Sequence, residues 1–329
     1  MAVMRFGLIG CGPMGRDLAK HLREVSETAV VAVSDPADDA RQQAAQAHNA
    51  QAYTEYPELL SREDVDAVII ATPTHLHKEI TIAAAQAGKH VFCEKPMALT
   101  IADCDAMIAA ADRAGVKLVI GQVLRLLYPF ARIAELARED ELGIPVAVDI
   151  ARYNPWSPRA GWRRRMDQSG GPLYELNVHE LDFMRHLCGE VAQVSAAGGN
   201  YLHPDLDFPD VFFITLKFRS GAVGRLRGGG ASLIQRYIGE VICPRGTLWW
   251  DRNEGKQFVC RPGAEPESLD ATPWTKPNGY VWELGSFVEW VRRGTAPVVT
   301  AQDGRAAVEL AEATYRSMES GKPIDLPLR

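Results

Sequence analysis

The first third of the chain alternates short apolar runs with helix-like segments. The runs are rich in Val, Ile or Phe and almost continuous, which is typical of strands buried on both faces of a parallel sheet. Ala-rich segments separate them, and at residues 100–114 Thr100 and Asp103 form a variant of the capping box. This alternation predicts a doubly wound sheet with right-handed crossovers. The predicted strands lie at residues 5–9, 30–34, 67–71, 90–93 and 117–121.

The pattern changes after residue 122. Longer strands follow with few helices between them, and the strand at 211–218 alternates apolar with more polar positions. A strand of this kind has one solvent-facing side, so we expect an open, largely antiparallel sheet. Two helices, at residues 281–293 and 304–320, are predicted near the end of the chain. The further strands are predicted at residues 146–153, 191–197, 211–218, 222–227, 237–243 and 247–250.

These patterns predict an α/β protein with two domains, as its length of 329 residues also suggests. Residues 1–122 form the N-terminal doubly wound parallel sheet, and residues 123–329 form a C-terminal α/β domain with a large, open, mostly antiparallel sheet. The chain is 47% hydrophobic and 24% charged, which excludes a disordered protein.

Composition and charge also narrow the partners and the compartment. No apolar run is long enough for a transmembrane helix, and residues 1–10 lack the pattern of a signal peptide. The net charge of −6 argues against nucleic acid and anionic membranes as partners, because Lys and Arg are not in surplus. The six cysteines contain no C-x-x-C pair, so we expect reduced thiols in the cytoplasm.

A glycine-rich loop follows the first predicted strand and opens a helix. In such a loop Gly10 allows the tight turn, Gly12 lets the backbone approach a pyrophosphate, and Gly15 lets the helix pack against the strand. The free N–H groups at the helix start then bind the phosphates, and a proline is accepted in this first turn. The predicted dinucleotide loop is Gly10-Cys11-Gly12-Pro13-Met14-Gly15.

The second predicted strand ends at Asp35. A carboxylate there accepts hydrogen bonds from ribose hydroxyls and repels a 2′-phosphate, so Asp35 favours NAD over NADP. Arg41 is expected to lie too far along the next helix to reverse this preference. The alternative is an ordinary strand–helix turn followed by an unrelated aspartate.

Two further stretches, together with the glycine loop, identify a family. The first combines A-T-P-T-H-L-H at residues 71–77 with A-G-K-H-V-F-C-E-K-P at residues 87–96. The second is G-G-P-L-Y-E-L-N-V-H-E-L-D at residues 170–182. They resemble the Gfo/Idh/MocA family (glucose–fructose oxidoreductase, inositol dehydrogenase and relatives) over essentially the whole chain, including F-R-S-G-A at residues 218–222 and Asp303-Gly304.

The resemblance implies a fold, an activity and an assembly. It implies an N-terminal Rossmann domain that holds NAD(P), and a C-terminal sheet that covers the active site with one face. The other face of this sheet is expected to form a homodimer or homotetramer interface. The implied reaction is the reversible oxidation of a secondary alcohol on a sugar, a cyclitol or a derivative.

Lys95 matches the family's catalytic lysine. It follows the fifth predicted strand, at the carboxyl edge where doubly wound sheets bind ligands, so it is expected to touch both cofactor and substrate. A cation there stabilises the charge that develops on the substrate oxygen. The resemblance also implies a cis Lys95–Pro96 bond and a cofactor-side position for Glu94. Outside this motif, an ordinary surface lysine would be the simpler interpretation.

A polar stripe lies on the helix predicted between Pro172 and Gly189. Without the resemblance, this stripe is equally compatible with a solvated helix face. Its members, spaced at i, i+4, i+7 and i+11, are Glu175, His179, Asp182 and His186.

The resemblance gives the stripe a function. His179 matches the catalytic histidine, the general base toward the substrate hydroxyl, and Asp182 matches a substrate-binding acid. Glu175 stands where many members carry Asp; as a catalytic residue it would orient His179 or bind a substrate hydroxyl. Asn177 stands where Gly is common. Because Glu175 departs from the family pattern, the substrate cannot be copied from an Asp-bearing inositol dehydrogenase.

Further residues match cofactor or substrate positions of the family. For Asn154, Trp162 and Arg163 a structural role fits the sequence equally well. His75 and His77 have no further ligand at metal spacing, so no metal site is predicted. The remaining cofactor candidates are Thr72, Pro73, His77, Gln122, Trp162 and Arg163, and the remaining substrate candidates are Arg125 and Asn154.

Three functions remain open besides an NAD-dependent dehydrogenase of a sugar or cyclitol. An enzyme on the same scaffold can retain NAD and cleave a glycosidic bond by transient oxidation, without net redox change. A non-catalytic dinucleotide sensor would be expected to lack the lysine or the histidine, both of which are present. A linear amino or imino substrate is also compatible, because the fold does not fix the substrate.

Overall fold

The computed structural model describes residues 3–155, 161–271 and 273–328, which form two compact units. The first unit contains the chain up to Val123 together with Pro277–Arg305, and the second contains Leu124–Lys276 and the chain from Ala306 onward. The sequence predicts residues 123–329 as one domain, and in the structure residues 277–305 of this stretch pack with the first unit.

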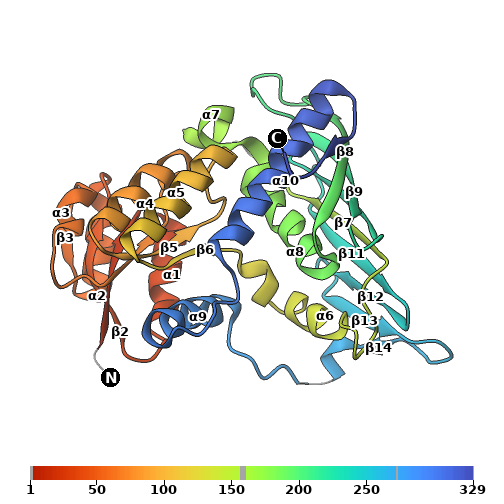
Figure 1. The fold of residues 1–329 in the computed structure, drawn as a ribbon, viewed down its shortest axis with the longest axis horizontal. Coiled ribbons are helices and arrows are strands. Elements are labelled where there is room, and N and C mark those ends of the chain that lie inside the picture. The colour runs from red at the N-terminus through yellow and green to blue at the C-terminus, as the bar shows by residue number, and fades with distance from the viewer. Residues whose placement is uncertain (1–2, 156–160, 272, 329) are drawn as a thin grey trace. The chain divides into compact units, whose positions relative to one another are not determined.

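The first unit is built on a parallel sheet of six strands in the order β3-β2-β1-β4-β5-β6 (Figure 1). All of its strand pairs are parallel. The order reverses between β1 and β4, and ligands of doubly wound sheets bind beyond the carboxyl ends of the strands at this point. The strands are β1 (Met4–Ile9), β2 (Thr28–Ser34), β3 (Gln51–Tyr53), β4 (Ala67–Ile70), β5 (His90–Glu94) and β6 (Leu118–Gly121).

Five of these strands were predicted to within two residues at either end. Their interiors are almost completely buried, as the continuous apolar runs indicated. The prediction missed β3, because its three residues are only partly buried and contain no apolar run. Thr100 caps α5 as expected, since its Oγ1 accepts the Asp103 N–H at 3.1 Å. The helices of this unit are α1 (Pro13–Leu22), α2 (Asp38–His48), α3 (Tyr56–Leu60), η1 (Thr74–Leu76), α4 (His77–Gln86), α5 (Ile101–Ala114) and α9 (Gly279–Arg293).

Helix α9 belongs to the first unit because its apolar face completes that unit's core. The Phe287 ring packs edge-on against Phe6 at 6.2 Å and Phe92 at 6.1 Å between ring centroids. Leu284, about one turn before Phe287, and Val288, the next residue, are buried in the same cluster. The sequence shows the amphipathic pattern of α9 but not which sheet it covers.

The second unit contains a nine-stranded sheet in the order β14-β13-β12-β11-β7-β10-β9-β8-β15. Strands β7 and β10 are parallel, and the other pairs are antiparallel. The predicted class, a doubly wound parallel sheet plus a mostly antiparallel sheet, is therefore confirmed. The strands are β7 (Ala147–Tyr153), β8 (Val191–Gly199), β9 (Val211–Phe218), β10 (Val223–Gly229), β11 (Arg236–Cys243), β12 (Gly246–Asp251), β13 (Lys256–Cys260), β14 (Glu267–Ser268) and β15 (Ile324–Asp325).

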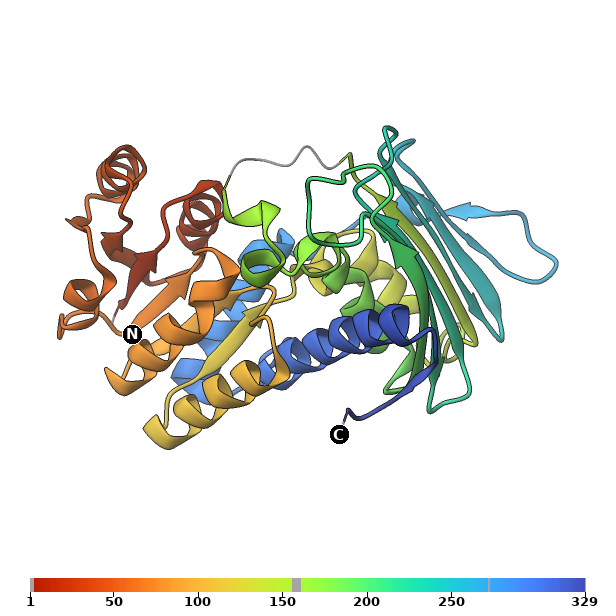
Figure 2. The same ribbon diagram turned by 90° about the horizontal axis from the view of Figure 1, so that it is seen from above.

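Helices of the second unit cover one face of this sheet, as Figure 2 shows for α8 and the second half of α10. Strand β9 alternates as predicted: Phe212, Ile214 and Leu216 are buried, and the residues between them are exposed. The helical segments are η2 (Val123–Leu126), α6 (Phe130–Leu136), η3 (Trp162–Arg164), α7 (Met166–Ser169), the π-helix η4 (Leu173–Asn177), α8 (Val178–Cys188), η5 (Leu269–Ala271) and α10 (Ala301–Ser320).

Helix α10 begins in the first unit and continues into the second. Thr300 and Asp303 form a reciprocal capping box at its start, three residues earlier than predicted. A side chain on Gly304 would come within 2.6 Å of Ile120, so glycine is required where the helix approaches β6. Among the described residues, no helix combines the length and apolar character needed to cross a membrane.

Candidate active site

The three motif glycines of the loop after β1 have different surroundings. Gly10 has a φ of +92°, and a Cβ on it would lie 2.6 Å from the Ala71 carbonyl oxygen. A Cβ on Gly15 would lie 2.0 Å from the Gly10 carbonyl oxygen. At Gly12, by contrast, no atom lies within 4 Å of the added Cβ position. The loop is therefore folded around Gly10 and Gly15 and leaves open space at Gly12, which fits a bound pyrophosphate.

The helix that follows presents its N-terminus to this space. Gly12 is the N-cap of α1 and Pro13 is its first residue. The N–H groups of the first turn have no acceptors within the helix, so they can bind phosphate oxygens. Met14 packs partly buried against the core cluster. Burial, reinforced by the negative charge of Asp35, raises the pKa of Cys11 to about 12, so this thiol is a core group.

Asp35 is fixed at the end of β2 by two backbone donors. Its Oδ2 accepts the Cys11 N–H at 2.7 Å and its Oδ1 accepts the Ala37 N–H at 2.8 Å. The carboxylate is thus oriented before any ribose binds. Arg41 was considered too distant, but its Nη1 donates to the Asp35 carbonyl oxygen at 2.7 Å. Helical side chains lean toward the helix N-terminus, which brings this guanidinium back to the strand end.

The loop after β4 lies against the glycine loop. The Cβ position of Gly10 lies 2.8 Å from the Thr72 amide nitrogen, and the Thr72 hydroxyl oxygen is buried without a hydrogen-bond partner. An orphaned hydroxyl here is consistent with a ligand partner. Pro73 is partly buried, and both ring nitrogens of His77 lie near backbone carbonyl oxygens, at 2.9 and 3.0 Å.

Lys95 directly follows β5 at the same sheet edge. Its N–H donates to the Glu94 Oε2 at 3.1 Å, and the Lys95–Pro96 peptide bond is cis, as the resemblance implies. The Glu94 carboxylate lies over Gly121. A Cβ added to Gly121 would lie 3.1 Å from Glu94 Oε1. Gln122, which follows β6, is fully buried. The neighbouring strand ends β4, β5 and β6 therefore carry most of the predicted cofactor residues after the glycine loop.

In the second unit, the predicted polar stripe lies on two kinds of helix. Residues 173–177 form a π-helix, and only from Val178 onward is the chain α-helical. The stripe does not share one environment: Asp182 is fully buried, His179 is partly buried and His186 is exposed. A solvated helix face, the alternative left open by the sequence, is thus excluded at Asp182.

Arg125 and Asp182 form a bidentate ion pair in the interior of the second unit. Arg125 Nε lies 2.7 Å from Oδ2 and its Nη2 lies 2.6 Å from Oδ1. The two side chains are only 5% and 0% exposed. The pair joins two predicted substrate residues from η2 and α8, and the geometry is the strongest that Arg and a carboxylate adopt.

A second buried carboxylate, Glu180, was not predicted from the sequence. It accepts from Arg152 Nη1 at 2.7 Å, from the Tyr237 hydroxyl at 2.8 Å and from Asn177 Nδ2 at 3.1 Å. These contacts tie the first turn of α8 to strands β7 and β11. Burial, together with the charge of Glu180, raises the pKa of Tyr237 well above its usual value.

The only sequence signal for this network was the Asn177–Glu180 pair at helical i, i+3 spacing. Asn177 stands where the family commonly has Gly, and its Oδ1 lies 2.6 Å from the Cβ position of Gly228 on β10. The space for this larger side chain therefore comes from a glycine on the sheet.

Glu175 pairs with Arg163 rather than lying alone on the stripe. Arg163 Nε lies 3.1 Å from Glu175 Oε2, and the Arg163 guanidinium stacks over the Trp162 ring at 4.4 Å. The structure thus brings together three residues predicted separately for catalysis and cofactor binding. Asn154 is exposed at the end of β7, where its N–H donates to the Gly229 carbonyl oxygen at 3.3 Å.

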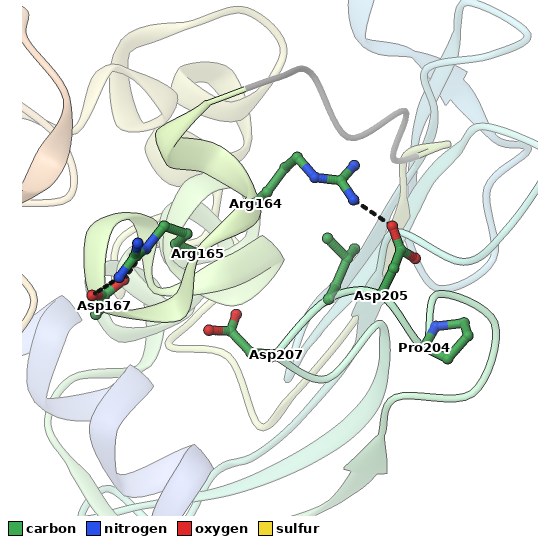
Figure 3. A pocket seen from close by; sticks show the side chains of 7 residues that line it. Arg164, Arg165, Asp167, Pro204, Asp205 and Asp207 are labelled. Carbon is green, nitrogen blue, oxygen red and sulfur yellow. Dashed lines mark hydrogen bonds and ion pairs between the residues drawn. The ribbon is translucent and has the colours of Figure 1, made fainter.

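A cavity of about 620 Å³ lies next to the Trp162–Arg163 segment (Figure 3). Its charged side chains pair with one another: Arg164 with Asp205, and Arg165 with Asp167. Asp207 Oδ1 accepts the Met166 N–H at 2.8 Å. The Arg164–Asp205 and Met166–Asp207 contacts fasten residues 162–169 to the loop between β8 and β9. None of the residues predicted from the sequence lines the cavity.

Comparison with known proteins assigns the two units. The family model of NAD-binding Rossmann domains of Gfo/Idh/MocA oxidoreductases matches residues 4–122. The model of the α/β C-terminal domain of the same family matches residues 134–326. The chain belongs to the Gfo/Idh/MocA oxidoreductase family.

Named relatives of this Gfo/Idh/MocA chain have varied activities. A myo-inositol 2-dehydrogenase from Thermotoga maritima is 29% identical, with 98% of each chain covered. A 2,7-anhydro-N-acetylneuraminate hydratase from Mediterraneibacter gnavus is 34% identical, with 99% of this chain and 97% of the relative covered. The crystal structure of an aldose-aldose oxidoreductase from Caulobacter crescentus has a TM-score of 0.90 and 27% identity, covering 98% of this chain and 100% of that one.

The predicted family, the oxidoreductase class and the NAD-binding domain are therefore confirmed. The chain is therefore a member of this oxidoreductase family with an NAD-binding Rossmann domain. Among residues 3–155, 161–271 and 273–328, no group of three or more His, Cys, Asp or Glu side chains is arranged to hold a metal ion.

Proposed function

We propose that this Gfo/Idh/MocA enzyme oxidises a secondary alcohol of a sugar, a cyclitol or a derivative with NAD, and that Lys95 and His179 are its catalytic residues. The substrate class is supported by relatives named for myo-inositol and for aldoses. The cofactor is supported by the open space at Gly12, the oriented carboxylate of Asp35 and the orphaned hydroxyl of Thr72.

Oxidation of a secondary alcohol removes a hydroxyl proton and a hydride from the same carbon. When bound, NAD supplies the hydride acceptor. A ring nitrogen of His179 takes the hydroxyl proton as general base. The Lys95 ammonium stabilises the negative charge that develops on the oxygen.

The other predicted residues orient cofactor and substrate in this proposal. The motif glycines, Pro13, Met14, Thr72, Pro73 and Gln122 surround the dinucleotide, and Glu94 holds the Lys95 backbone. Arg125, Asn154, Glu175 and Asp182 are proposed to bind or orient the substrate. Because both Asp182 oxygens already bind Arg125, this pair is proposed to present the guanidinium and carboxylate as one rigid unit.

The observation that carries the proposal is the position of Lys95. Both Lys95 and the glycine loop lie at the carboxyl edge of the parallel sheet, after β5 and β1. Only β4 separates these two strands, so the two sites lie about 10 Å apart at ~4.8 Å per strand. A cation at this distance from the pyrophosphate site is suited to act at the reactive end of a dinucleotide.

The lysine is tested with Lys95→Ala. We expect kcat to fall by roughly 10²–10⁴-fold with NAD binding retained, because the variant loses charge stabilisation but not the glycine loop. Reduced nicotinamide absorbance measures turnover over a panel of sugars, inositols and sugar acids, and calorimetry measures NAD binding. Lys20→Ala, at an exposed position on α1, is the control. Undiminished turnover of Lys95→Ala would overturn the assignment.

The histidine is tested with His179→Asn. We expect a similar fall in kcat and loss of the acidic limb of the pH–rate profile, because Asn cannot accept the hydroxyl proton. His186→Asn, at an exposed position on the same helix, is the matched control and keeps wild-type kinetics. Equal activity of the two variants would exclude His179 as the base.

The relative from Mediterraneibacter gnavus favours one further candidate function. Its name is that of a hydratase, and hydration of an anhydro sugar has no net redox change. An enzyme of this kind would retain NAD and release product by transient oxidation. Copurification of NAD, with sugar released but no accumulation of reduced nicotinamide, would select this candidate over the dehydrogenase.

We also propose that the chain forms a homodimer or homotetramer through the outer face of the nine-stranded sheet. Phe213, Val223 and Ile242 on β9, β10 and β11 are 51%, 50% and 40% exposed there. Light scattering of Phe213→Lys tests this, with a shift to smaller particles expected. A cytoplasmic location is proposed as well, supported by six cysteines that are all free thiols.

A further inference from the structure

His77 is buried between two loops at the carboxyl edge of the parallel sheet. It is the first residue of α4 and is only 1% exposed. Its Nδ1 lies 2.9 Å from the Pro96 carbonyl oxygen, and its Nε2 lies 3.0 Å from the Thr72 carbonyl oxygen. One ring thus connects the loop after β4 with the loop after β5.

Both partners of the ring are carbonyl oxygens, which can only accept hydrogen bonds. A ring nitrogen can therefore bind its carbonyl oxygen only when it carries a proton. A neutral imidazole has a single N–H group. The neutral ring binds one of the two carbonyls at a time, whereas the imidazolium binds both. A His77 ring that donates to these carbonyl oxygens holds the backbone of Pro96 or Thr72 in place.

The carbonyl bound by Nδ1 belongs to the residue that follows Lys95. Pro96 has no N–H, so this carbonyl is its one polar backbone group. On the other side, the Lys95 N–H donates to Glu94 Oε2 at 3.1 Å. The backbone around Lys95 is therefore held both before and after the residue, by Glu94 and by His77.

We propose that His77 is a positioning residue for Lys95, which it fixes through the Pro96 carbonyl oxygen. The proposal rests on the proposed function, in which Lys95 is catalytic. Lys95 carries its ammonium on a flexible side chain, so the start of that side chain must be fixed by the backbone. Misplacement of a catalytic group by about 1 Å can cost roughly 10²-fold in rate.

Three substitutions at His77 separate the two contacts. Asn places its side-chain N–H₂ near the position of Nδ1, and Gln places it near that of Nε2, whereas Phe removes both donors. We expect kcat of His77→Phe to fall by about 10–100-fold with the Kd for NAD changed less than about threefold. His77→Asn is expected to keep most of kcat and His77→Gln to resemble His77→Phe. His75→Phe, two residues away and exposed, is the control and keeps wild-type kinetics.

The double variant Lys95→Ala/His77→Phe distinguishes positioning from general damage. If His77 acts through Lys95, adding His77→Phe to Lys95→Ala lowers kcat no further. A further drop in the double variant, or wild-type kcat in His77→Phe while Lys95→Ala is impaired, would overturn this inference alone. Wild-type turnover in Lys95→Ala itself would instead overturn the proposed function, and this inference with it.

Discussion

The nucleotide site of the first unit and the polar site of the second differ in which part of the chain forms them, the backbone or the side chains. The first is made of backbone: Gly10 and Gly15 are required by close contacts, Gly12 leaves open space, and Asp35 is held by two N–H groups. The second is made of side chains that meet across the fold. Arg125 and Asp182 are 57 residues apart in sequence, and Arg152 and Glu180 are 28 apart.

This difference determines which of the two sites can be recognised from the sequence. A backbone site needs a few small residues in a fixed local order, so it is visible as a motif. A side-chain site needs charges that compensate one another after folding, and burial makes each partner depend on the other. We therefore expect a substitution at the open position of the backbone site, Gly12, to weaken ligand binding, and a substitution in the buried side-chain site to lower folding stability.

The largest expected effect is at the buried ion pair. Asp182→Ala leaves the Arg125 guanidinium buried without its carboxylate, so we expect the free energy of unfolding to fall by about 3–5 kcal/mol. Arg165 and Asp167 form a pair of the same bidentate type, but both side chains are 62% exposed. Asp167→Ala is therefore the control and should change stability far less. Urea denaturation measures both, and equal losses would contradict the role of burial.

Alanine at the motif glycines sharpens the comparison within the backbone site. Gly15→Ala would bring a methyl group onto the Gly10 carbonyl, so we expect a loss of about 1–3 kcal/mol in unfolding free energy.

Gly12 has open space and a φ of −62°, which alanine adopts easily. Gly12→Ala is expected to keep its thermal stability but to bind NAD at least about tenfold more weakly, because the methyl occupies the pyrophosphate space. Calorimetric NAD titration and thermal melts separate the two. A Gly12→Ala protein with normal NAD affinity would show that this space is not used.

The Glu180 network should respond more mildly to the loss of one donor. Tyr237→Phe removes one of three hydrogen bonds to the Glu180 carboxylate without changing volume, and we expect a loss of about 1 kcal/mol. Tyr201→Phe, at an exposed tyrosine, serves as the reference in the same denaturation experiment. Stability equal to wild type in Tyr237→Phe would mean that the hydroxyl contributes nothing to holding α8.

The smallest effect is a pH dependence at His90 on β5. Burial, and next the charge of Lys117, lowers the pKa of His90 below the value of about 6.5 in an unfolded chain. Its Nδ1 accepts the Lys117 N–H at 3.0 Å, which requires this nitrogen to be unprotonated. The unfolded state then binds more protons between the two pKa values, so the stabilisation is complete above about pH 6.5 and declines as the pH falls.

The His90 contribution is isolated with His90→Asn, which keeps an acceptor but does not titrate. Its unfolding free energy should change less than that of wild type between pH 7 and pH 5. His75→Asn, at an exposed histidine, should follow the wild-type curve. Parallel curves for His90→Asn and wild type would exclude this histidine as a contributor.

Much of the fold was predictable because local patterns carry it. Buried parallel strands appear as continuous apolar runs, β9 as an alternating one, and the cap of α5 as Thr100. The short strand β3 and the sheet against which α9 packs could not be predicted, because neither is set by a local sequence pattern. The candidate site divides in the same way: the glycine loop and the Lys95 motif are local, whereas the partners of Asp182, Glu175 and Glu180 are set by tertiary packing. The π-helix at residues 173–177 likewise gives no periodic signal in the sequence.

The return of Pro277–Arg305 to the first unit has a consequence for how the protein is made. The ribosome delivers the six strands of the first sheet more than 150 residues before it delivers α9, whose Phe287 covers Phe6 and Phe92. During that interval the nascent sheet keeps an apolar face open while the second unit is synthesised. Completion of the nucleotide-binding unit is therefore a late event in translation, although that unit starts the chain.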